Sequence, residues 1–314
     1  MEYETILNCR ISKLTLGTAQ LGFQYGVSNR TGKPDDETAR KILDIAVTNG
    51  VNCFDTAHAY GDSEAIIGSF LSSCKGLSNS PLIVSKLGPV EVTGKITSDN
   101  VYQKVRSQIE ESLKRLQLTK IPIYLLHSAA DLHTYNGLLI ESLLRLKEQG
   151  LIGHLGASVY SPEEAEMVLQ VKEMKAIQVP INIFDHRIID SGILKQLYEK
   201  RIIVFARSLF LQGLLFINPD NLPFGMEFVR KPLIELYNLS SRHNISPAQM
   251  AVSFVRDLPE VTSIVIGAET PEQVVDNIRL LATSPISLDL RGELMDTFAN
   301  MPTRVVNPSL WGIN

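Results

Sequence analysis

Eight short runs rich in Val, Ile and Leu alternate with segments whose apolar residues recur at helical spacing. These runs end near Gly17, Asp55, Lys86, His127, Gly156, Pro180, Ala206 and Gly267. Most steps between them are about 30 residues, the size of a strand, its helix and their turns. The last step is longer and leaves room for an extra helical segment. This rhythm predicts an α/β fold, a single-domain (β/α)8 TIM barrel over residues 1–314.

Several helix boundaries carry their own signals. Acidic residues open a helix after Pro34, and Ser98 with Asp99 are placed to cap another. Thr270 as N-cap and Pro271 at the first helical position begin a further helix. We also expect helices over 231–242, 247–256 and 288–301.

The composition leaves ample apolar surface for a large core, since 44% of the 314 residues are hydrophobic and 20% are charged. A net charge of −4 and a pI near 5.9 argue against nucleic-acid or membrane-surface binding. No apolar run approaches the ~18 residues that a membrane span needs, and the N-terminus lacks a signal-peptide pattern. We therefore expect a cytoplasmic protein whose partner is a small molecule.

Cysteine usage agrees with a reducing cytoplasm. Cys9, Cys53 and Cys74 are an odd number and lack metal-binding spacing. Cys53 falls within an apolar strand pattern, so we expect a small buried side chain there.

The stretch 51–64 carries the most informative polar residues. It begins as a strand and then turns polar, and Asp62 or Ser63 is placed to cap the helix that follows. Asp55 thus stands where the strand ends, and Tyr60 stands in the loop after it. Taken alone, they fit a capping carboxylate and a half-exposed phenol, because turns are rich in such residues.

Other strands end in ionisable residues too: Lys86, His127 and Arg207. A lysine at a strand end usually points to water, and a lone histidine is often a core residue bonded to the backbone. In a barrel, however, the carboxyl ends of all strands meet at the face where barrel enzymes carry their active sites. Asp55 can then supply the counter-charge that Lys86 needs.

The sequence contains Asp55-Thr56-Ala57-x-x-Tyr60-Gly61-x-Ser63-Glu64, followed by Lys86 and His127. This pattern resembles the aldo-keto reductase superfamily, and the resemblance extends from about Leu14 to about Arg279. It implies a barrel that binds its dinucleotide at the strand ends, and indeed no Gly-x-Gly-x-x-Gly follows a predicted strand. It also implies an NAD(P)(H)-dependent oxidoreductase that reduces an aldehyde, ketone or sugar-like carbonyl to an alcohol, or the reverse.

The resemblance implies a catalytic tetrad of Asp55, Tyr60, Lys86 and His127. Carbonyl reduction needs a hydride from the cofactor and a proton from the protein. A free tyrosine, with a pKa near ~10, is a poor proton shuttle at neutral pH, so we expect Lys86, held by Asp55, to lower the pKa of Tyr60. Tyr60 is then the general acid in reduction and the base in oxidation, and His127 orients the carbonyl. No metal is required.

The cofactor-binding residues that the resemblance implies are Gly17, Thr18, Asp55, Ser158, Gln178, Arg207, Ser208, Phe210, Leu211, Gly213, Gly267, Glu269, Thr270, Gln273 and Asn277. Ser158 and Gln178 match the positions that hold the nicotinamide carboxamide. Relatives commonly have Asn directly after this serine, whereas this chain has Val159, and Asn182 is a candidate substitute.

Two further cofactor regions depart from the family pattern. Relatives usually stack an aromatic residue on the nicotinamide at the position of Arg207; a guanidinium also stacks, and its charge should favour the neutral, reduced cofactor. The segment 208–214 resembles the pyrophosphate-binding loop. NADP(H) is the family default, but Glu269 would repel a 2′-phosphate and accept a hydrogen bond from a free 2′-hydroxyl. The charge therefore favours NAD(H) or dual use.

Two alternative functions stay open. A cofactor-binding sensor or auxiliary subunit on the same barrel fits the departures at Val159 and Arg207, although an intact tetrad argues against it. A metal-dependent hydrolase would use Asp55, His58 and His127, but it leaves the lysine of the tetrad without a role.

Several smaller expectations complete the interpretation. His58 is a candidate substrate contact, and His133 is expected at the surface. The loops 88–97 and 129–136 are expected to shape the substrate pocket. Trp311, the only tryptophan, either lines that pocket or anchors the tail. We expect a monomer or a weak homo-oligomer.

Overall fold

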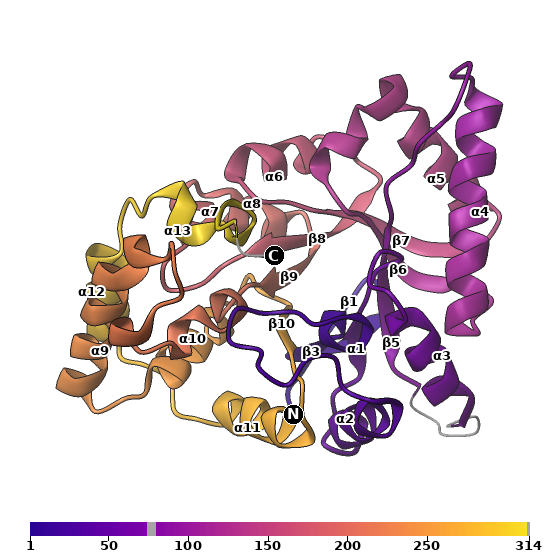
Figure 1. Cartoon of the computed structure of the whole chain (residues 1–314). Helices are drawn as coiled ribbons and strands as arrows, with labels where there is room; N and C mark the ends of the chain where they lie inside the picture. The colour runs from indigo at the N-terminus through magenta and orange to yellow at the C-terminus, as the bar shows by residue number, and fades with distance from the viewer. Residues whose placement is uncertain (74–79, 313–314) are drawn as a thin grey trace.

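Eight parallel strands close into a barrel in the computed structural model, which describes residues 1–73 and 80–312. The strands are β3 (Leu14–Gly17), β4 (Cys53–Asp55), β5 (Leu82–Leu87), β6 (Ile121–Leu126), β7 (Ile152–Ser158), β8 (Met174–Pro180), β9 (Ile203–Arg207) and β10 (Ser263–Gly267). They follow chain order around the barrel, and β10 pairs with β3 to close it. Helices surround the strands (Figure 1). The predicted (β/α)8 fold is confirmed.

The larger helices outside the barrel are α2 (Asp36–Thr48), α3 (Ser63–Ser73), α4 (Ser98–Leu116), α5 (Leu138–Glu148), α6 (Pro162–Leu169), α8 (Ile193–Glu199), α9 (Arg230–His243), α10 (Pro247–Arg256), α11 (Pro271–Leu281) and α12 (Leu288–Thr297). Short helical turns are α1 (Ala19–Gly22), α7 (Arg187–Asp190), α13 (Thr303–Val306), and the 3-10 turns η1 (Ala129–Leu132), η2 (Thr134–Gly137), η3 (Leu211–Phe216), η4 (Pro219–Asn221), η5 (Glu227–Val229) and η6 (Pro308–Leu310). The long interval before β10 holds α9 and α10, in agreement with its length.

Helix starts follow the sequence signals with small shifts. Thr270 caps α11, and its side chain accepts a hydrogen bond from the N–H of Gln273, as predicted. For α4 the cap is Thr97, so the expected capping by Ser98 and Asp99 was wrong; both residues lie inside the first turn. The last predicted helix, 288–301, ends earlier, at residue 297.

Parallel pairing brings the strand ends to one edge. Gly17 pairs with both Gly267 and Asp55, and Ser158 pairs with Gln178. The last pair shows that β7 runs two residues past its predicted end, because its ladder with β8 continues to Ser158. Similarly, β5 continues one residue past its predicted end, and β6 ends one residue before His127.

Two apolar layers stabilise the barrel. One lies between the strands and the helices. The other fills the barrel interior with Cys53, Val84, Ile123, Leu125, Ala176, Ile203 and Phe205; Cys53 is buried, as predicted. An antiparallel hairpin, β1 (Tyr3–Ile6) with β2 (Cys9–Ser12), was not predicted. It adds Ile6 and Ile11 to the interior layer at the N-terminal end of the barrel and leaves the C-terminal edge open.

The C-terminal tail is anchored rather than directed into the site. Trp311 is buried in the layer between strands and helices, and its Nε1 donates to the Arg304 carbonyl at 2.7 Å. Of the two roles considered for Trp311, the structure therefore favours the anchor.

Residue 74 lies outside the described part of the chain, so only two cysteines can be placed. Cys9 and Cys53 are free thiols, and the prediction for Cys74 is untested. Within the described ranges, none of the helices has the length and apolar character that a membrane span requires.

Candidate active site

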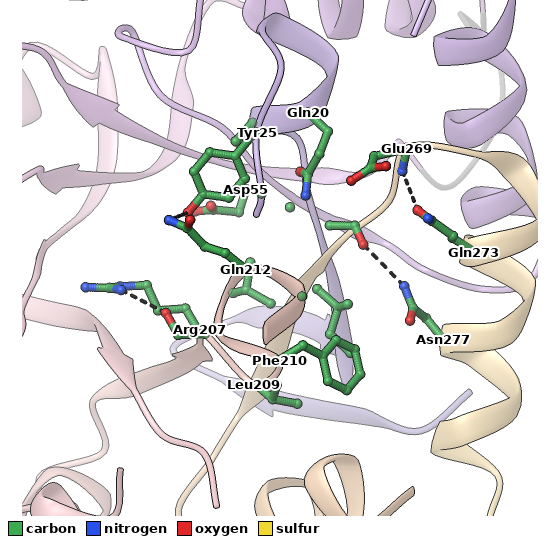
Figure 2. Close-up of a pocket in the computed structure, with 18 of the residues that line it drawn as sticks. Gln20, Tyr25, Asp55, Arg207, Leu209, Phe210, Gln212, Glu269, Gln273 and Asn277 are labelled. Atoms are coloured by element: carbon green, nitrogen blue, oxygen red, sulfur yellow. Dashed lines mark hydrogen bonds between the residues drawn. The ribbon is translucent and has the colours of Figure 1, made fainter. Parts of the chain in front are cut away.

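The carboxyl ends of the strands open into a cavity of about 640 Å³. Predicted site residues that line it are Gly17, Thr18, Asp55, Tyr60, His127, Ser158, Gln178, Arg207, Ser208, Phe210, Gly213, Gly267, Glu269, Gln273 and Asn277. Figure 2 shows many of these side chains around a common space. Three predicted site residues do not line the cavity. Lys86 is fully buried, Leu211 belongs to the apolar core, and Thr270 caps α11.

Lys86 and Asp55 form a buried ion pair at the cavity floor. Lys86 Nζ lies 2.7 Å from Asp55 Oδ1, and it also donates to the Thr56 carbonyl at 2.9 Å. The same oxygen of Asp55 accepts a hydrogen bond of 2.7 Å from Gln178 Nε2. The carboxylate is thus held by one cation and one amide, and charge-assisted bonds of this kind are strong.

Tyr60 and His127 lie next to this pair. Lys86 Nζ is 4.9 Å from the centroid of the Tyr60 ring. The rings of Tyr60 and His127 meet edge to face, with centroids 5.8 Å apart. The four predicted tetrad residues therefore come together from β4, β5 and the segments that follow β4 and β6.

Burial is the largest cause of the pKa shifts of Tyr60, Lys86 and His127. Burial raises the pKa of Tyr60 well above its ordinary value, Asp55 adds to the rise, and the charge of Arg207 opposes it. The expected lowering of the Tyr60 pKa by Lys86 was therefore wrong: the lysine charge is matched by Asp55, and burial outweighs what remains. Burial also lowers the pKa of Lys86, while the charge and the hydrogen bond of Asp55 raise it. It lowers the pKa of His127 to about 4, with the charges of Lys86 and Arg207 adding to the effect.

Ser158 and Gln178 lie side by side because their strands pair at these residues. The residue after the serine, Val159, is buried and does not line the cavity. Asn182 is not a substitute for a missing amide, and that expectation was wrong. It is fully buried away from the cavity, and its Oδ1 accepts hydrogen bonds from two backbone N–H groups of its own turn.

Arg207 ends β9 and lines the cavity. Its guanidinium lies 4.3 Å above the ring of Tyr160, a residue that sequence analysis did not select. It donates to the Val159 carbonyl and to Ser208 Oγ, each at 3.0 Å; Figure 2 shows the second bond. No carboxylate in the described part of the chain pairs with it.

The segment after β9 has an unusual backbone. Ser208, Leu211 and Gln212 have positive φ angles of 63°, 47° and 56° although none is glycine. Such conformations cost energy and concentrate at functional sites. Gly213 continues the run at +89°, and a Cβ there would lie 1.8 Å from Ser28 Oγ. Glycine is therefore needed both for the backbone angle and for the close contact.

Sequence analysis missed one wall of the cavity, the segment 20–28. The lining residues from it are Gln20, Tyr25, Gly26 and Ser28. Gln212 holds this segment in place, since its Nε2 donates to the Tyr25 hydroxyl at 3.2 Å and its carbonyl accepts from the Val27 N–H at 3.0 Å. The mixture of glycine and aromatic residues in Gly22-Phe23-Gln24-Tyr25-Gly26 was the available signal.

The outer end of the cavity carries charges of both signs. Glu269, Asp276 and Arg279 line it. Burial raises the pKa of Glu269, and a hydrogen bond from Thr31 at 3.4 Å opposes the rise. Arg279 Nη1 lies 3.1 Å from Asp276 Oδ1, so its charge is matched within its own helix.

Two side chains of α11 turn back to the loop before it. Gln273 Oε1 accepts from the N–H of Glu269 at 2.7 Å, and Asn277 Nδ2 donates to the Gly267 carbonyl at 3.3 Å, as Figure 2 shows. These bonds hold the loop and the helix start together at the cavity edge.

Of His58, His133 and the two loops expected near the substrate pocket, only His133 lies where the sequence predicted. His58 turns away from the cavity, with Nδ1 3.3 Å from Ser112 Oγ on α4, and His133 is exposed, as predicted. Neither of the loops 88–97 and 129–136 lines the cavity; they contact each other, with the Tyr135 hydroxyl 2.9 Å from the Val90 carbonyl. Within residues 1–73 and 80–312, no three or more His, Cys, Asp or Glu side chains are grouped so that they could hold a metal ion.

A sequence model of the Aldo/keto reductase family matches residues 13–289. The chain belongs to the aldo/keto reductase family. This membership supports an oxidoreductase, and together with the orientation of His58 it argues against the hydrolase alternative.

Individual aldo/keto reductases agree with this assignment. The NADH-specific methylglyoxal reductase of Escherichia coli K12 is 27% identical over 300 residues, which cover 86% of this chain and 90% of the relative. The glycerol dehydrogenase of Gluconobacter oxydans is 26% identical with a TM-score of 0.72, covering 98% of both chains. An aldo-keto reductase from Bacillus halodurans has a TM-score of 0.76 and covers 99% of both chains, and at 22% identity it supports the fold alone.

Proposed function

We propose that this aldo/keto reductase interconverts a small aldehyde, ketone or sugar-like carbonyl compound and its alcohol, with Tyr60 as general acid and base. The observation that carries the proposal is the ion pair of Lys86 and Asp55 behind the Tyr60 ring, with His127 at the ring edge. Burying two charges is expensive and contributes little net stability. A proton-transfer site gives a reason for placing them there.

The residues around the cavity fit a nicotinamide dinucleotide. Gly17 and Gly267 pair at the strand ends and present bare backbone, and a Cβ at Gly267 would lie 2.3 Å from the Gln20 side chain. Ser158 and Gln178 would hold the carboxamide, and the start of α11 offers N–H groups to a phosphate. When bound, the cofactor supplies or accepts the hydride.

The protein's part is to hold and move one proton. Because burial raises its pKa, Tyr60 keeps its proton at neutral pH and can donate it to the carbonyl oxygen. His127 has a pKa of about 4 and is neutral there, so it can donate a hydrogen bond to the same oxygen. In alcohol oxidation the base is the phenolate that forms when the proton leaves Tyr60, and Lys86 Nζ lies 4.9 Å from the centroid of that ring.

We propose NAD(H) or dual cofactor use, against the NADP(H) default of the family. Glu269 stands at the outer end of the cavity, where the charge of Arg279 is matched by Asp276. The relative from Escherichia coli is named as NADH-specific. We also propose a cytoplasmic monomer or weak homo-oligomer; the free thiols of Cys9 and Cys53 suit a reducing compartment.

The test is turnover of methylglyoxal and glyceraldehyde by the wild type and by Tyr60→Phe, with NADH and with NADPH. We expect the variant to lose at least about 10²-fold in kcat, the usual contribution of a general acid, while the Kd of the cofactor changes little. Tyr135→Phe, outside the cavity, is the matched control. Full activity of Tyr60→Phe would overturn the role of Tyr60. Cofactor binding by the wild type without turnover of any carbonyl would favour the sensor alternative.

A further inference from the structure

The inner half of the cavity carries one positive charge that the protein does not offset. Among the described residues, the charged side chains that shift the pKa values of Tyr25, Tyr60 and His127 are Asp55, Lys86 and Arg207. Asp55 is matched by Lys86 at 2.7 Å. His127 adds no charge at neutral pH, because its pKa is about 4. The charge that remains belongs to Arg207.

The neighbouring acidic residues are committed elsewhere. Asp185 binds Arg187, with both carboxylate oxygens 2.7 and 2.8 Å from its guanidinium. Arg187 also donates to the Tyr160 carbonyl at 3.1 Å. Glu269 stands at the outer end of the cavity and contacts Thr31. Arg207 is therefore left without a protein counter-ion among these residues.

Arg207 is held in position and still has donors to offer. The face of its guanidinium lies on Tyr160, and its two hydrogen bonds go to Val159 and Ser208. A guanidinium has five N–H donors in a fixed planar fork. A guanidinium that is already stacked and hydrogen-bonded loses little conformational entropy when it binds an anion, and its planar geometry matches carboxylate and phosphate.

We propose that Arg207 binds an oxyanion of the substrate, so that this reductase prefers small aldehydes or ketones that carry a carboxylate or a phosphate. The inference rests on the proposed function and adds the substrate class to it. The anion would neutralise the uncompensated charge beside Tyr60 and His127, and the same charge would draw anionic substrates into the cavity. In the structure the guanidinium stacks on Tyr160, whereas sequence analysis expected it to stack on the nicotinamide.

The experiment compares pairs of substrates in which one member carries an anionic group and the other does not. The pairs are succinate semialdehyde with butanal, and glyceraldehyde 3-phosphate with glyceraldehyde, each with the preferred cofactor. The proteins are the wild type, Arg207→Gln, Arg207→Lys and the control Arg106→Gln, a half-exposed residue of α4 paired with Glu110. We expect the wild type to favour the charged member of at least one pair by about tenfold or more in kcat/KM, the range of one charge-assisted hydrogen bond.

In Arg207→Gln the ratio of kcat/KM for the charged member to kcat/KM for the uncharged member should fall toward 1 in the pair that responds. Arg207→Lys should keep part of the preference, and Arg106→Gln all of it; the pair that responds identifies carboxylate or phosphate. Equal treatment of both members by the wild type would overturn the inference. So would an equal loss for both members in Arg207→Gln with weaker cofactor binding, which would assign the arginine to the cofactor. Absence of turnover for all four compounds would instead reject the proposed function, and this inference with it.

Discussion

Lys86 Nζ lies 2.7 Å from Asp55 Oδ1, and the two side chains are only 1% and 6% exposed. The pair joins adjacent strands of the barrel, β5 and β4, directly beneath the cavity. Each charge is tolerated because the other is present, and an unpaired charge at this depth is strongly unfavourable. The chemistry proposed for the site and the stability of the barrel therefore share the same contact.

Removing one partner of this pair should lower both the stability and the activity of the protein. Removing both partners should restore the stability but not the activity. We expect Lys86→Met to lower the free energy of unfolding by about 3–5 kcal/mol, because Asp55 is left buried and unpaired. The double variant Asp55→Asn with Lys86→Met should recover most of this stability and remain inactive. Urea unfolding and kcat measurements check both parts. Recovery of activity in the double variant would show that the pair is only structural.

His127 should make the protein less stable in mild acid. Its pKa is lowered from 6.5 to about 4 in the folded state, so the unfolded chain binds more protons between these values. The free energy of unfolding should therefore fall as the pH drops from about 6.5 to about 4. Urea unfolding across this window should show a shallower fall for His127→Gln than for the wild type. The exposed His133→Gln serves as control, and equal slopes in all three proteins would contradict the assignment.

Glu269 should disfavour NADPH. It lines the outer end of the cavity, and replacing it with arginine removes a repulsive charge and adds a donor for a 2′-phosphate. We expect Glu269→Arg to shift the ratio of NADPH to NADH affinity toward NADPH by about tenfold or more, the range of a charge-assisted hydrogen bond. Titration of cofactor fluorescence measures both Kd values. Glu272→Arg, an exposed residue outside the cavity, is the control; an equal shift there would mean that only overall charge matters.

Gly213 should be sensitive to a methyl group for a reason beyond its backbone angle. Gly213 and Gly225 have similar φ angles of +89° and +82°, but only at Gly213 would a Cβ meet another segment, Ser28 Oγ at 1.8 Å. We expect Gly225→Ala to cost about 1–2 kcal/mol for the left-handed conformation alone. Gly213→Ala should cost more and should weaken cofactor binding, because the wall formed by residues 20–28 must move. Unfolding and cofactor titration test this, and Ser28→Gly in the Gly213→Ala background should restore part of both losses. Equal effects of the two alanine variants would remove the role of the contact.

Sequence patterns predicted the structure correctly where the deciding interactions are between neighbours in the chain. The apolar runs marked all eight barrel strands, and Thr270 with Pro271 marked the start of α11, because strand burial and N-capping depend on neighbours in the chain. The convergence of Asp55, Lys86 and His127 also followed from the pattern, since parallel strands share one carboxyl edge. Strand ends were less accurate: the end of β7 is set by its ladder with β8, and residue types in one strand do not report it.

The sequence by itself determined the barrel, the strand edge that holds the site and the four residues that meet there. Only the tertiary structure decided the ionisation of Tyr60, because that depends on how deeply the ring is buried and on the cancellation of Lys86 by Asp55. It also decided that Arg207 stacks on Tyr160 and that residues 20–28 form a wall held by Gln212, 187 positions from its partner Tyr25. Such contacts join segments far apart in the chain, and their energies arise only when the closed barrel brings those segments together.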